Sequence, residues 1–79
     1  MNDSRAIIAE AIARVAPDVD VDTLDPDADL RDAAGLDSMD FLNVVVAVHE
    51  RTGIDIPERD YPRLSTFASF AEYLAAATA

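Results

Sequence analysis

The sequence contains no cysteine, no lysine and only one histidine, His49. Without cysteine the chain can form no disulfide and no thiolate metal site, and it has no thiol nucleophile of its own. Without lysine, six arginines face sixteen acidic residues, which gives a net charge of -10. This charge disfavours nucleic acids and anionic membranes as partners, because both attract positively charged proteins. We expect protein partners with basic surfaces instead.

A long apolar segment is also missing. No stretch approaches the roughly 18 apolar residues of a membrane-spanning helix. Arg5, Glu10 and Arg14 interrupt the apolar residues near the N-terminus, where a secretory signal would need an apolar centre. The 79 residues, of which 51% are apolar, suffice for one small core. We therefore expect a single domain over residues 1–79 that is a monomer in the cytoplasm and has no membrane span.

Apolar residues recur at helical spacing in three segments, which predicts helices over about residues 4–15, 38–51 and 66–76. Asn2, Asp3 or Ser4 can cap the first helix and Ser65 or Thr66 the third, because each offers a side-chain oxygen. Gly53 is expected to end the second helix. In the third helix the side chains expected to face inward are Phe67, Phe70, Ala71 and Leu74.

The connections between these helices contain most of the helix-breaking residues. Pro57 and Pro62 limit the segment before the third main helix to a short helical turn. Residues 18–34, with Pro26 and many aspartates, are expected to form a long loop. The predicted fold is therefore all-α: a small four-helix bundle of three main helices plus one short helix, with a long loop between helices one and two.

The predicted second helix has two unlike faces. Its core face is expected to carry Phe41, Val44, Val45, Val48 and Thr52. The opposite face presents Met39 and Val46 beside Asn43 and Glu50, so these two apolar residues lack an evident role in the core.

The stretch "GLDSMD" places Ser38 at the expected start of this helix, flanked by Asp37 and Asp40. A catalytic serine needs a base within hydrogen-bond reach, whereas His49 lies eleven residues along the same helix, about 16 Å away. The stretch also differs from the G-x-S-x-G elbow of many hydrolases. We therefore disfavour a hydrolase. The three residues can instead form a helix cap, or the helix start can carry a phosphate.

The segment 18–40 contains nine aspartates, with Arg31 as its only basic residue. The first three aspartates alternate as in an EF-hand loop, but Thr23 replaces the turn glycine and Asp29 replaces the bidentate glutamate. The pattern is a poor match to a calcium sensor. Three interpretations stay open: a solvated surface, an electrostatic docking face near Ser38, and weak binding of divalent cations.

The segment "DPDADLRDAAGLDSMDFLNVVVAVHERTGIDIP" resembles the acyl carrier proteins. That family has a glycine, a short gap and then Asp-Ser-Leu or Asp-Ser-Met followed by an acid. The resemblance extends over nearly the whole chain and also includes Leu64, Thr66 and the final "FAEYLA". It implies a four-helix bundle that catalyses nothing by itself. It also implies that Ser38 receives 4'-phosphopantetheine from coenzyme A through a phosphopantetheinyl transferase, and that the thiol of this arm carries acyl groups as thioesters.

The resemblance further implies that the second helix docks acyl-transferring and acyl-modifying enzymes that have basic patches. The docking residues expected on it are Asp37, Met39, Asp40, Val46 and Glu50. Asn43 and His49 stand where fatty-acid carriers usually have further acids, and Phe41 is bulky for its place. The pathway therefore stays open between fatty-acid synthesis, polyketide synthesis and a specialised acyl transfer. The alternative is an acidic interaction or calcium-responsive module with no prosthetic group.

Overall fold

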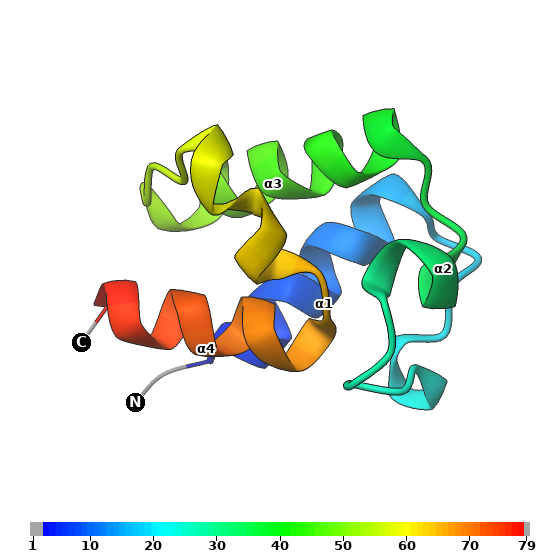
Figure 1. Ribbon diagram of the computed structural model, residues 1–79. Coiled ribbons are helices and arrows are strands. Elements are labelled where there is room, and N and C mark those ends of the chain that lie inside the picture. Colours follow the sequence, from blue (N-terminus) through cyan, green and yellow to red (C-terminus); the bar gives the residue numbers. More distant parts are fainter. Residues whose placement is uncertain (1–2, 79) are drawn as a thin grey trace.

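The computed structural model describes residues 3–78, which form six helical segments and no strand (Figure 1). None of these helices is both long enough and apolar enough to cross a bilayer. The all-α bundle predicted from the sequence is confirmed. The segments are α1 (Ser4–Val15), the 3₁₀ turn η1 (Val21–Thr23), α2 (Leu30–Ala34), α3 (Ser38–Thr52), the 3₁₀ helix η2 (Glu58–Leu64) and α4 (Phe67–Thr78).

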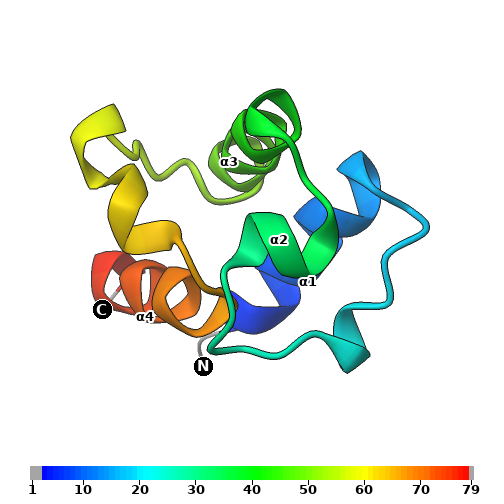
Figure 2. The same ribbon diagram turned by 45° about the vertical axis from the view of Figure 1, so that its right-hand side comes forward.

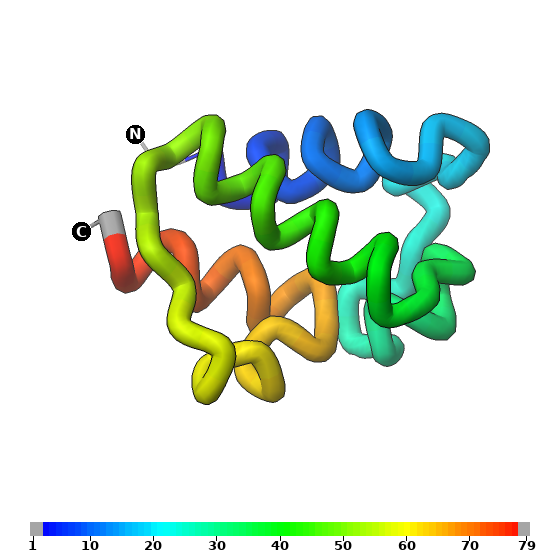
Figure 3. Tube along the Cα trace, turned by 90° about the horizontal axis from the view of Figure 1, so that it is seen from above, coloured from blue at the N-terminus to red at the C-terminus, as the bar shows by residue number. Residues whose placement is uncertain are grey.

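Helix α1 is central to the bundle, since it contacts both α3 and α4. Helices α3 and α4 run in the direction opposite to α1, and η2 lies against α4 (Figures 1 and 3). The three main helices bury one apolar stripe each, as amphipathic helices in a small domain do. The largest fully buried side chains are Phe70, Ile8, Ile12, Leu30, Leu64, Leu74, Val44 and Val48.

The three main helices predicted from apolar spacing are confirmed. Gly53 ends α3 in the left-handed conformation, with φ of 73°, and its N–H donates to the His49 carbonyl. Thr66 caps α4, because its Oγ1 accepts a hydrogen bond from the Ser69 N–H at 3.0 Å. Asp3 occupies the N-cap position of α1 without a side-chain hydrogen bond to the helix. Ser4, the second candidate, is the first residue of the helix, and Asn2, the third, lies outside the described residues.

The expected core faces are also found, with one refinement in α3. Val44, Val45 and Val48 are buried as predicted, whereas Phe41 and Thr52 are only partly buried at the edge of the core. All four inward residues predicted for the last helix are buried.

The segment predicted as one long loop contains a short helix, α2, which the sequence analysis missed. The Asp29 carboxylate caps it by accepting from the Asp32 N–H at 3.2 Å. Gly35 ends it with a left-handed φ of 67°. Leu30 and Ala34, one helical turn apart, are both buried. Five residues are too few to show a helical period among so many aspartates, but caps at both ends and two anchors on one face stabilise the turn.

Two backbone hydrogen bonds tie this aspartate-rich segment to the start of α4. The Leu30 N–H donates to the Ser65 carbonyl at 2.6 Å, and the Ala68 N–H donates to the Pro26 carbonyl at 3.0 Å. Figure 2 shows α2 near the beginning of α4, with a short connection leading from α2 to the start of α3. Because α2 is fixed to the bundle in this way, its side chains have a defined position relative to the start of α3.

Candidate functional site

Asp37 and Asp40 form a reciprocal capping box at the start of α3. The Asp37 carboxylate accepts from the Asp40 N–H at 2.8 Å, and the Asp40 carboxylate accepts from the Asp37 N–H at 3.5 Å. Asp37 is thus the N-cap, and Ser38 is the first residue of the helix. The helix cap predicted for these three residues is found, with Asp37 and Asp40 as its members, and Ser38 takes no part in it. The Ser38 hydroxyl is exposed and has no part in holding the helix together.

The Ser38 hydroxyl does have one side-chain partner, which the sequence analysis did not identify. The Arg31 guanidinium, on α2, donates to Ser38 Oγ at 2.8 Å. In the sequence, Arg31 is distinguished only as the single basic residue among nine aspartates. Its contact with Ser38 depends on the turn of α2 and the left-handed Gly35, neither of which was predicted.

A groove of about 500 Å³ begins beside these two residues. It lies between α3 and η2, and its apolar wall includes Phe41 and Tyr61, whose rings pack edge to face with centroids 6.1 Å apart. The other lining residues are Asp29, Arg31, Ser38, Leu42, Glu58, Pro62 and Ser65. The large side chain of Phe41 therefore forms part of the groove wall and does not fill the groove.

His49 cannot serve Ser38 as a base. Both residues lie on α3, near its opposite ends, as predicted. The His49 ring is held at the other end of the helix, where Nδ1 lies 2.9 Å from the Ile54 carbonyl oxygen and 3.4 Å from an Asp55 carboxylate oxygen. A serine–histidine dyad is therefore absent from the described residues, in agreement with the argument against a hydrolase.

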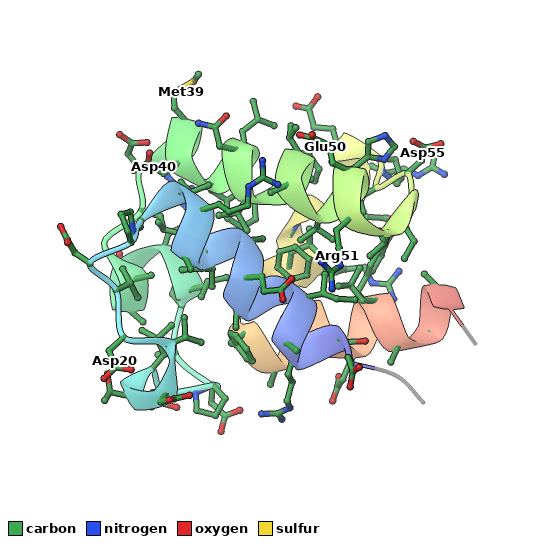
Figure 4. The ribbon with its side chains drawn as sticks, turned by 180° about the vertical axis from the view of Figure 1, so that it is seen from behind. Asp20, Met39, Asp40, Glu50, Arg51 and Asp55 are labelled. Carbon is green, nitrogen blue, oxygen red and sulfur yellow. The ribbon has the colours of Figure 1, made fainter. Side chains whose placement is uncertain are left out.

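The outward face of α3 carries exposed apolar side chains, as the helical wheel predicted for Met39 and Val46. Met39 is 65% exposed and Val46 is 46% exposed, and Leu42, which was not singled out, is 39% exposed between them. Leu42 follows Met39 by three residues and precedes Val46 by four, so the spacing could have identified it. Figure 4 shows Met39 projecting away from the bundle at the start of α3, with Asp40 beside it and Glu50 further along the helix.

Arginines also border this face, so its charge is mixed beyond the first turn. A shallow hollow between α1 and α3 is lined by Arg14 together with Asp40, Val46 and Glu50. On the same side, Arg51 forms a salt bridge with Glu10 of α1, in which Arg51 Nη1 and Glu10 Oε2 are 3.2 Å apart. Asp37, Met39 and Asp40 thus form an acidic and apolar start of the face, while Glu50 lies near basic groups.

The aspartates before α2 have local structural roles. The Asp20 carboxylate accepts from the Asp22 N–H at 3.1 Å, and the Asp25 carboxylate accepts from the Asp27 N–H at 2.9 Å. Both contacts fix turns of the chain. Within residues 3–78, no three histidine, aspartate or glutamate side chains are placed so that they could hold a metal ion together.

Comparisons with known proteins point to one family. Residues 6–74 match the family described as the phosphopantetheine attachment site. The chain is 34% identical over 72 residues to an acyl carrier protein of Streptomyces coelicolor, covering 91% of this chain and 78% of that protein.

In two further relatives the matched region is a smaller share of the relative's own length. The acyl carrier protein AcpXL of Mesorhizobium japonicum is 38% identical over 50 residues, which are 63% of this chain and 53% of that protein. The non-reducing polyketide synthase Preu3 of Preussia isomera is 36% identical over 66 residues, which are 84% of this chain and 3% of the synthase. The match over residues 6–74 and the relative in Streptomyces coelicolor together show that this chain belongs to the acyl carrier proteins, the non-catalytic carriers that bear phosphopantetheine.

Proposed function

We propose that Ser38 is the residue to which 4'-phosphopantetheine is attached, and that residues 1–79 act as one monomeric carrier domain in the cytoplasm. The observation that carries this proposal is the state of the Ser38 hydroxyl. It is exposed, it is free of any capping role, and it sits on a helix start that the Asp37–Asp40 capping box holds in place. A hydroxyl so placed can be modified while the helix beneath it stays folded.

The residues around Ser38 fit a phosphate-linked arm. Arg31 offers a cation at the hydroxyl oxygen. The groove beside Ser38 offers an apolar wall that includes Phe41 and Tyr61. The phosphate of the arm would thus lie near a cation, and the less polar chain that follows it would lie near an apolar wall. These surroundings support Ser38, rather than another exposed serine, as the attachment site.

The attachment reaction needs a base, and residues 3–78 place no histidine at Ser38 and no carboxylate there outside the capping box. The Ser38 oxygen forms a bond to phosphorus, the phosphoanhydride bond of coenzyme A breaks, and adenosine 3',5'-bisphosphate leaves. The hydroxyl proton has to be accepted by the transferase, because His49 is held at the far end of α3 and both nearby aspartates are engaged in the capping box. The arm, once attached, supplies the thiol that this cysteine-free chain lacks.

The outward face of α3 is the surface that we propose for docking. Asp37, Asp40 and Glu50 would attract basic patches on the transferase and on acyl-transferring and acyl-modifying enzymes. Met39 and Val46, with Leu42 between them, would form the apolar centre of the contact. Bringing the carrier and enzyme together raises the local concentration of the cargo at the enzyme's active site.

The pathway that we propose is a specialised acyl transfer or polyketide synthesis, with fatty-acid synthesis as the alternative. The mixed charge around Glu50, from Arg14 and from the Glu10–Arg51 pair, supports enzymes whose docking patches are less uniformly basic. The names of the relatives include both acyl carrier proteins and a polyketide synthase.

The proposal is tested by measuring the intact mass of the chain after incubation with coenzyme A and a broad-specificity phosphopantetheinyl transferase. We expect the native chain to gain the mass of one arm and Ser38→Ala to gain none. Ser65→Ala is the matched control, since Ser65 is exposed on the same groove, and it should gain one arm as the native chain does. Absence of a mass gain in the native chain, while the transferase modifies another carrier protein, would overturn the proposal.

A further inference from the structure

The contact between Arg31 and Ser38 joins two helices at the proposed attachment atom. The guanidinium donates directly to Oγ at 2.8 Å, although the surrounding segment is rich in carboxylates. Within residues 3–78 the one arginine–carboxylate pair is that of Arg51 with Glu10, so Arg31 pairs with no carboxylate. Asp29, which lines the same groove, accepts a hydrogen bond from the Asp32 N–H. The charge of Arg31 is therefore available to an anion at Ser38.

The backbone of Arg31 is held firmly. Its carbonyl oxygen accepts from the Gly35 N–H and, at 2.8 Å, from the Leu36 N–H. Leu30 beside it is buried and donates its N–H to the Ser65 carbonyl. Because the backbone is already ordered, little further conformational freedom is lost when the side chain binds a group at Ser38.

We propose that Arg31 is a positioning residue that binds the phosphate of the arm on Ser38, an inference that rests on the proposed attachment at this residue. The phosphorus would be bonded to the same oxygen that Arg31 already contacts, so the anionic oxygens would lie one bond further on. A guanidinium binds phosphate oxygens through two parallel N–H groups, and such charge-assisted hydrogen bonds are roughly twice as strong as neutral ones. Attachment would thus replace a hydrogen bond to a hydroxyl by a stronger contact with a phosphate.

The consequence is a fixed start for the arm. Arg31 and Ser38 both line the groove that Phe41 and Tyr61 border. A phosphate bonded to Ser38 and held by Arg31 would place the first atoms of the arm at the groove. The arm would then sample fewer directions than an arm on a freely rotating serine side chain.

The first test uses the native chain, uniformly labelled with ¹⁵N, in its unmodified and loaded forms. If Arg31 binds the phosphate, loading shifts the side-chain N–H resonance of Arg31 by more than that of Arg59, an exposed arginine that does not line the groove. This measurement needs no variant, so it decides the matter even if substitution of Arg31 disturbs α2. An Arg31 resonance that does not move on loading would overturn the proposal.

The second test follows the ³¹P resonance of the loaded chain. Arg31→Gln should change its chemical shift and narrow its line, because the phosphate gains mobility, whereas Arg59→Gln removes the same charge and should leave both unchanged. Arg31→Lys should bring the ³¹P chemical shift part of the way back to its value in the native chain. Identical ³¹P spectra for the native chain and Arg31→Gln would overturn the role of Arg31 alone. Failure of the attachment at Ser38 would show separately, as the absence of a mass gain in every variant.

Discussion

Asp37 and Ser38 are neighbours with separate roles, and stability measurements can distinguish them. Asp37 caps α3 through its carboxylate, so Asp37→Ala should lower the free energy of unfolding by about 1 kcal/mol, within the range of roughly 0.5 to 2 found for helix caps. Ser38→Ala removes only an exposed contact with Arg31 and should change the free energy of unfolding by less than about 0.5 kcal/mol. Urea unfolding of both variants checks this. A loss in Ser38→Ala as large as that in Asp37→Ala would contradict the assignment of the cap.

Tyr73 is the residue from which a pH effect is expected. Its hydroxyl, on α4, donates to the Asp60 carboxylate of η2 at 2.7 Å, and this hydrogen bond is the main cause that raises the pKa of Tyr73 above its ordinary value of 10.0. Folded Tyr73 keeps its proton to a higher pH than unfolded Tyr73. Its contribution to stability is therefore complete below the unfolded pKa and is lost as pH rises through the raised folded pKa.

The measurement is urea unfolding of the native chain and Tyr73→Phe from about pH 8 to about pH 11, on either side of the ordinary tyrosine pKa. The native chain should lose stability above about pH 10 more steeply than Tyr73→Phe, because only the native chain has this proton to lose. Equal slopes for the two proteins would show that the Tyr73–Asp60 hydrogen bond does not stabilise the fold.

At the residue scale, the sequence identified Ser38 and its exposed neighbours but not Arg31. Met39 and Val46 follow from a helical wheel, which needs only the period of one helix. The contact of Arg31 with Ser38 depends on three structural features at once: the short α2, the left-handed Gly35 and the tether to Ser65. Sequence spacing within one helix carries no information about such a contact between two helices.

At the scale of single elements, α3 presents the surface on which docking can be tested. Asp37 and Asp40 are poor first targets, because reversing either charge would also break the capping box. Glu50→Lys and Val46→Ala avoid this difficulty. Each should lower kcat/KM for modification by the transferase by roughly fivefold, which corresponds to about 1 kcal/mol.

The two substitutions should differ in their response to salt. The effect of Glu50→Lys should shrink as salt is added, since it acts through charge, whereas that of Val46→Ala should persist. Glu72→Lys is the control: Glu72 is exposed on α4, so reversing its charge should leave the kinetics unchanged. Unchanged kinetics in Glu50→Lys and Val46→Ala, or an equal loss in Glu72→Lys, would count against docking through α3.

The elements themselves were predictable to different degrees. The three main helices have a clear apolar period and recognisable ends, at Gly53 and Thr66 among others, and were found. The helix α2 was missed because its five residues show no period, and because its caps, Asp29 and Gly35, resemble ordinary loop residues. Its stability comes from these caps and from the burial of Leu30 and Ala34, and local sequence does not reveal which residues are buried.

At the scale of the whole molecule, the concentration of negative charge has a cost. Nine aspartates lie within residues 18–40, and the net charge is -10. Their repulsion should weaken as salt shortens the range of electrostatic forces, to about 10 Å at 0.1 M. We therefore expect the melting temperature to rise with added NaCl; a gain of about 1 kcal/mol would raise it by roughly 4–8 °C.

The same experiment separates the carrier from the calcium-responsive alternative. Calcium chloride at matched ionic strength should stabilise the protein about as much as NaCl if only screening is involved. A melting temperature that stays constant in NaCl would contradict the screening argument. A much larger and saturable gain in calcium would instead support the alternative.

The most direct measurement of the central claim is the location of the arm by peptide mass. Cleavage after arginine releases residues 32–51 as one peptide, in which Ser38 is the only hydroxyl-bearing residue. After incubation with coenzyme A and the transferase, the mass of one arm should appear on this peptide, and the peptide that contains Ser65 should keep its original mass. An arm found on any other peptide, or on none, would contradict the account of Ser38 as the attachment site.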